Sequence, residues 1–208
     1  LRLGTLGIGT VQALNGELIV VDGHAWSAHA DGTVHALAPT VMTPFAVVVP
    51  FAPTATLTSD GPLDFDELHG ALDDMAPADA PVIAVRIDGD FTVLVLRSVE
   101  RQTKPYKPLR EVVAHQSEWR VERASGTVVG FRFPDATAGV EVPGHHLHFL
   151  SDDRKLGGHI ISIALEQGEL AVDPCHELHV ELPPGMELGQ PGTVDRAEIA
   201  KIEGGTTG

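Results

Sequence analysis

The chain has 208 residues and a formal net charge of −15, from 29 acidic and 14 basic residues. This excess of negative charge argues against a nucleic-acid partner. No apolar stretch is long enough to span a bilayer as a helix, so a membrane partner is not expected either. The length suits one domain over 1–208, or two closely joined lobes. The lone Cys175 cannot form an internal disulfide and fits a cytoplasmic location; it is assigned no role.

The first predicted elements are strands. Glu17–Val21 and His24–Ala28 flank Asp22-Gly23, a strong signal for a two-residue hairpin. A second Asp-Gly pair leads into a short strand at residues 33–37. Residues 45–51 form a near-continuous apolar run, which is typical of a buried strand.

One helix is predicted with clear boundaries. Leu68, Leu72 and Met75 repeat at helical spacing, so they lie on one face. Asp64 precedes them as an N-cap, and Glu67 three residues later completes a capping-box pattern.

The later elements return to strands. Residues 82–87 and 91–96 flank Asp88-Gly89-Asp90, which predicts another hairpin. A short helix is expected at residues 193–202, because Thr193 can cap it and two isoleucines share one face. Strands with a few helices and no regular βαβ alternation indicate an α+β fold, with a strand-rich mixed β-sheet or barrel-like core.

The most informative segment is a histidine-rich hairpin. On a strand, His146 and His148 project from the same side, whereas His145 points the other way. Residues 151–158 are rich in turn formers, after which His159 begins a β-branched run. Pairing His148 with His159 brings three imidazoles together and leaves a coordination position open, as a catalytic zinc or another divalent metal requires.

The remaining polar residues have ordinary explanations. Asp152, Asp153 and Arg154 are expected to form the turn and to orient the imidazoles. The isolated histidines are interpreted as surface or hydrogen-bonded core residues; they are His24, His35, His69, His115, His176 and His179.

Together these motifs resemble the α-acetolactate decarboxylase family. Residues 142–159 are similar to the family's metal-binding motif. Residues 15–19, 43–47 and 97–106 resemble its Asp-Gly-Glu-Leu, Thr-Pro-Phe and Arg-Ser-Val segments, in the same order, so that nearly the whole chain is covered. His145 stands where the family usually has tyrosine, and Asn15 where it has aspartate.

The resemblance implies a site and an activity. Zinc would be bound by His146, His148 and His159, with Glu17 near the metal, Arg97 facing the substrate and Glu203 as a second acidic residue at the metal. The implied reaction decarboxylates 2-acetolactate, a 2-hydroxy-3-keto acid, to acetoin and carbon dioxide. The metal would chelate the hydroxyl and ketone oxygens, and Arg97 would orient the carboxylate. The family also implies a homodimer.

Several alternatives stay open at this point. Glu17 and Arg97 with a bound water are both possible sources of the proton that reaches C2. In ordinary roles, Glu17 would be a solvated strand residue and Arg97 a surface ion pair, with Glu100 as its partner. A cupin-type metal enzyme also uses His-x-His, and a binding module could use the metal only to stabilise its fold.

Overall fold

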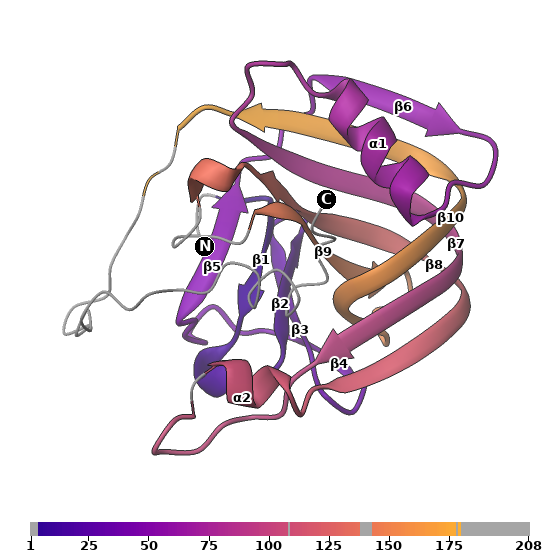
Figure 1. Cartoon of the computed structure of the whole chain (residues 1–208). Helices are drawn as coiled ribbons and strands as arrows, with labels where there is room; N and C mark the ends of the chain where they lie inside the picture. The colour runs from indigo at the N-terminus through magenta and orange to yellow at the C-terminus, as the bar shows by residue number, and fades with distance from the viewer. Residues whose placement is uncertain (1–3, 108, 138–142, 178, 180–208) are drawn as a thin grey trace.

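The described part of the chain folds into two five-stranded sheets (Figure 1). The structure is a computed structural model and describes residues 4–107, 109–137, 143–177 and 179. The first sheet has the order β4-β3-β2-β1-β5, and the second has the order β6-β10-β7-β8-β9. The first sheet comprises β1 (Leu6–Thr10), β2 (Glu17–Val21), β3 (His24–Ala28), β4 (Val34–Ala36) and β5 (Phe45–Val49). The second comprises β6 (Ala55–Ser59), β7 (Val82–Ser98), β8 (Ser117–Phe133), β9 (Gly144–Ser151) and β10 (Gly157–Cys175).

The helical elements of the described residues are few. They are α1 (Phe65–Met75), α2 (Leu109–Val113) and two short 3-10 turns, η1 (Gln12–Leu14) and η2 (Asp135–Thr137). The strand-rich α+β prediction is therefore confirmed, and the strand pairs among the described residues are antiparallel. No helix in the described part of the chain is long and apolar enough to cross a bilayer.

The second sheet closes on itself at one end. β7 pairs with β8, β8 pairs with β9, β9 pairs with the start of β10, and β10 pairs with β7. These four strands form a ring, which is the barrel-like core expected from the sequence. In Figure 1 the long strands β7, β8 and β10 curve around this ring beside the first sheet.

The β2–β3 hairpin forms as predicted. Its two turn residues, Asp22 and Gly23, have φ values of 51° and 76°, as a type I′ turn requires. β5 also forms, but the expectation that it is buried was wrong. Among the described strands β5 pairs with β1 alone and lies at the sheet edge, and Phe45 is 38% exposed.

The predicted hairpin within residues 82–96 was also wrong, because β7 runs without a break from Val82 to Ser98. Asp88 accepts hydrogen bonds from Arg86 and Thr127. Asp90 accepts hydrogen bonds from Ser125 on β8 and Gln167 on β10 and does not cap a turn. Gly89 is needed for close packing, since a Cβ there would collide with the main chain of β10.

Helix α1 begins and packs as expected. The Asp64 carboxylate accepts from the amide of Glu67, while the Glu67 side chain accepts from the amide of Asp64. Leu68 and Leu72 are almost fully buried and pack in one cluster with Phe149 and other residues of the second sheet. The helix thus covers one face of this sheet, and the first sheet covers the opposite face.

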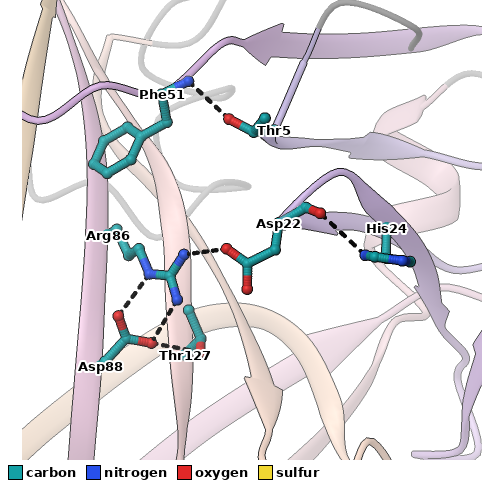
Figure 2. Close-up of polar contacts among 7 residues, drawn as sticks. All are labelled: Thr5, Asp22, His24, Phe51, Arg86, Asp88 and Thr127. Carbon is teal, nitrogen blue, oxygen red and sulfur yellow. Dashed lines mark hydrogen bonds and ion pairs between the residues drawn. The ribbon is translucent and has the colours of Figure 1, made fainter.

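Charged residues join the two sheets at one side (Figure 2). The guanidinium of Arg86 on β7 donates to Asp22 in the β2–β3 turn at 2.6 Å and to Asp88 at 2.6 Å. Thr127 donates to the same Asp88 carboxylate from β8. Apolar side chains, among them Ile19 and Phe131, fill the interface between the sheets. The position of β2 against the ring is therefore fixed by both charge and packing.

Candidate active site

Three imidazoles converge where the ring of strands β7, β8, β9 and β10 meets the first sheet. His148 on β9 and His159 on β10 are direct cross-strand partners, as predicted. His146 lies two residues earlier on β9, so it projects to the same side as His148. The three ring centroids are 4.9 to 5.3 Å apart.

His148 is held by the first sheet. Its Nδ1 lies 2.9 Å from the carbonyl oxygen of Leu18 on β2. If Nδ1 carries the proton and donates to this carbonyl, Nε2 keeps its lone pair. Burial, reinforced by the neighbouring His146, holds the pKa of His148 well below its ordinary value, so the ring is neutral at pH 7.

A buried ion pair lies beside these rings. Nη1 of Arg97, near the end of β7, is 3.5 Å from Oε1 of Glu17, the first residue of β2. The other Glu17 oxygen is 3.7 Å from Nε2 of His148. Arg97 is 4% exposed and Glu17 is 8% exposed. Neither residue is therefore a solvated surface group, and Arg97 does not need Glu100 as its partner.

The strand register explains why these residues meet. Arg97 pairs directly with His159 across β7 and β10, and His159 pairs with His148 across β10 and β9. Arg97, His159 and His148 thus lie side by side in one row across the neighbouring strands β7, β10 and β9. Glu17 reaches the row from the opposite sheet.

Glu17 owes its position to the residues before it. Gly16 has a φ of 104°, and a Cβ there would lie 2.7 Å from the carbonyl oxygen of Ala28. Thr10 donates to the carbonyl of Gly16 at 3.0 Å. Ser98, fully buried next to Arg97, donates to the carbonyl of Ala28 at 2.9 Å. No local pattern indicates these supports, because each depends on a distant strand.

Other expected residues lie elsewhere. Asp153 accepts from Ser151 and from the Lys155 amide, and Arg154 lies over the Trp26 ring at 5.9 Å. They form the turn as predicted. The described contact of His148 is the Leu18 carbonyl, and the expectation that Asp152, Asp153 and Arg154 orient the imidazoles stays a prediction.

His145 points away from the site, as predicted, and stacks on His69 of α1 at 4.1 Å. Glu203 and the predicted helix at 193–202 lie outside the described residues.

The three histidines suit a divalent metal. Their ligand atoms all lie within 4.8 Å of one another, and among the described residues they are the group that meets this geometry. Zinc binds imidazole nitrogen at about 2.0–2.1 Å, so the three nitrogens would move closer together to share one ion. Nε2 of His148 is buried and makes no hydrogen bond, as expected of a nitrogen whose lone pair binds a metal.

Comparison with known proteins points to one family. The family model of α-acetolactate decarboxylase matches residues 1–190. The α-acetolactate decarboxylase of Methylococcus capsulatus is 38% identical over 182 residues, covering 88% of this chain and 70% of that protein. The one from Methanosarcina mazei is 37% identical over 203 residues, covering 95% and 70%.

A crystal structure shows the same fold. The α-acetolactate decarboxylase of Bacillus subtilis strain 168 superposes with a TM-score of 0.90 at 31% identity, covering 99% of this chain and 88% of that one. The match spans both sheets and the histidine hairpin. The chain belongs to the α-acetolactate decarboxylase family.

Proposed function

We propose that this chain decarboxylates 2-acetolactate to acetoin and carbon dioxide, using a divalent metal, preferably zinc, held by His146, His148 and His159. The observation that carries the proposal is the convergence of these imidazoles beside the buried Arg97–Glu17 pair, in a chain of this family. When bound, the ion supplies Lewis-acid stabilisation of the negative charge that develops on the hydroxyl and ketone oxygens.

Arg97 binds and orients the carboxylate that leaves. Its guanidinium can form two parallel hydrogen bonds to a carboxylate, which fixes the plane of that group as well as its position. The bond to C2 breaks most easily when it is perpendicular to the ketone plane, so this orientation lowers the barrier. The buried position of Arg97 strengthens the interaction, because water competes for it poorly.

Loss of carbon dioxide leaves an electron pair on C2 that moves into the ketone as an enediolate. A proton must then reach C2 from one face. The proposed donor is Glu17, which lies beside His148 and Arg97 and would take up the required proton from solvent before it passes this proton to C2. Arg97 with a bound water is the alternative donor, and Glu203 is proposed as a second acidic group at the metal.

The test measures metal content and acetoin release in the same preparation. Chelation should abolish turnover, and one equivalent of a divalent metal should restore it. A protein that holds metal stoichiometrically but releases no acetoin from 2-acetolactate would contradict the proposal. That outcome would instead favour a cupin-type enzyme that acts on another substrate, or a binding module that the metal stabilises.

The domain organisation, the oligomeric state and the cellular location are part of the same proposal. We propose that residues 1–208 form a single domain, supported by a second sheet that packs on α1 with one face and on the first sheet with the other. A homodimer and a cytoplasmic location are proposed from the family and from the lone Cys175. Sedimentation of the purified protein and fractionation of its source cells test them.

A further inference from the structure

Basic residues gather in one short segment of this acidic chain. Residues 101–110 hold four of the chain's 14 basic residues and none of its 29 acidic ones. Residues 100–107, which we call the basic loop, connect the end of β7 with α2 and include one acidic residue, Glu100. Within it Arg101, Lys104 and Lys107 are all exposed.

These three cations differ from most others in the described part of the chain. Arg86, Arg97, Arg120, Arg132 and Lys155 each lie within 4 Å of a carboxylate. No such partner is found among the described residues for the cations of the basic loop, and Lys104 lies 6.0 Å from the Tyr106 ring instead. Within the described residues their charge is therefore not held in a direct ion pair and acts on the surrounding solvent.

The basic loop is anchored next to the site at two points. It begins just after Arg97, and four residues of chain place Arg101 at most about 14 Å from Arg97 between Cα atoms. The amide of Gln102 donates to the carbonyl of Ala13 in η1 at 2.7 Å. η1 leads through Gly16 directly into Glu17.

Apolar packing supports the same placement. Val99, at the start of the loop, is buried with Val112 and Val113 of α2, and Leu14 of η1 packs against this cluster. Figure 1 shows η1 and α2 side by side, at the ends of the strands that carry Glu17 and Arg97. The loop is thus bound to both segments that supply the buried ion pair.

We propose that the basic loop attracts the anionic substrate to the site. This rests on the proposed function, since 2-acetolactate carries one negative charge at neutral pH. The net charge of −15 repels such an anion, and the exposed cations of the basic loop oppose this repulsion on the side of the site where the loop is anchored. The product acetoin is neutral, so the same charges do not retain it.

The test compares kcat and kcat/KM at ionic strengths from about 0.02 to 0.5 M, because the screening length falls from about 20 Å to about 4 Å over this range. For the K104E/K107E protein, kcat/KM at low ionic strength should fall about tenfold, within the range known for electrostatic steering. The loss should shrink at high salt, and kcat should change little. The K104R/K107R protein keeps both charges and should retain the salt dependence.

A matched control removes a cation elsewhere. Arg123 on β8 is exposed and lies well along the strand from the site, opposite the middle of β7. Arg123→Gln should leave kcat/KM unchanged at every salt concentration, whereas Lys104→Gln should lower it at low salt.

Two results would overturn the proposal. One is a K104E/K107E protein whose kcat/KM at low salt matches the wild type. The other is an equal loss in kcat/KM at all ionic strengths, which would indicate a structural defect of the loop. A wild-type protein that holds metal but is inactive on 2-acetolactate would instead contradict the proposed function, and the steering proposal would fall with it.

Discussion

Nη1 of Arg97 lies 3.5 Å from Oε1 of Glu17, and this contact joins the two sheets inside the protein. The two residues are 80 positions apart in the chain and almost completely buried. A buried ion pair of this kind contributes little net stability by itself, but removal of one partner leaves an uncompensated charge. Variants at either residue must therefore keep the hydrogen-bonding capacity of the side chain wherever the aim is to test chemistry.

Arg97→Lys should strongly reduce turnover although it keeps the charge. Lysine cannot form two parallel hydrogen bonds to a carboxylate, so the substrate loses its orientation. We expect kcat/KM to fall by about 100-fold to 1,000-fold, as when one preorganised donor is removed from an active site. Steady-state kinetics on 2-acetolactate measure this.

Arg120→Lys serves as the control for that substitution. Arg120 is an exposed arginine paired with Glu122, and its replacement should leave kcat/KM and the melting temperature unchanged. Near wild-type turnover in the Arg97→Lys protein would exclude the carboxylate-binding role.

Glu17→Gln separates proton delivery from metal binding. Glutamine keeps the shape of the side chain but cannot supply the proton. If Glu17 is the donor, acetoin should form slowly and with lower optical purity, while the metal content is retained through the three histidines. Chiral chromatography of the product and metal analysis of the same sample give both readings.

Other outcomes for Glu17→Gln assign it a different role. A loss of metal with unchanged optical purity would make Glu17 a ligand. Unchanged rate, metal content and optical purity would show that the carboxyl group has no part in the reaction.

His148→Ala should abolish metal binding and turnover. The side chain is fully buried, and its neutral ring is held by the Leu18 carbonyl toward the other two imidazoles. Metal analysis after dialysis should show less than about a tenth of the wild-type content, in line with the affinity lost with one of three ligands. His115→Ala removes an exposed histidine near α2 and should retain full metal content. Full occupancy in the His148→Ala protein would refute the metal assignment.

His69 should make the protein less stable in acid. Burial, reinforced by His145, lowers the pKa of His69 from 6.5 to about 4. Between these values the unfolded chain binds more protons than the folded one, so the free energy of unfolding falls as the pH drops from 6.5 to about 4. Above pH 6.5 His69 is neutral in both the folded and the unfolded chain, so its effect on the free energy of unfolding no longer changes with pH.

His69→Phe should reduce this slope, by at most about 1 kcal/mol per pH unit. Phenylalanine keeps an aromatic ring between Phe65 and His145, so the packing of α1 is retained. Urea unfolding at several pH values between 4 and 7 measures the slope, and His24→Ala, at an exposed histidine, is the control. Equal slopes for wild type and His69→Phe would contradict the prediction.

Local patterns in the sequence predicted the local structure well. The Asp22-Gly23 turn, the Asp64 capping box and the pairing of His148 with His159 each depend on residues close together in the chain. A few dihedral angles and hydrogen bonds determine them, so their signals are readable without the fold.

The errors concern long-range contacts. Asp88-Gly89-Asp90 has the composition of a turn, but its side chains bind partners on β8 and β10, and the glycine allows β10 to approach. The apolar run at 45–51 predicted a strand, while its place at the sheet edge depends on the order of all five strands. The Leu18 carbonyl, which holds His148, is a main-chain group, so no residue type in the sequence indicates this contact.

The ring of β7, β8, β9 and β10 also sets the order in which the site can form. His148 meets Leu18 across 130 positions, and His159 pairs with Arg97 only after β10 has docked on β7, whereas its pairing with His148 is local to the β9–β10 hairpin. Contacts so distant in sequence form slowly, because loop closure must precede them. The three histidines lie together on one local hairpin, whereas Arg97 and the Leu18 carbonyl join them only through these distant contacts, so the complete site forms late in folding.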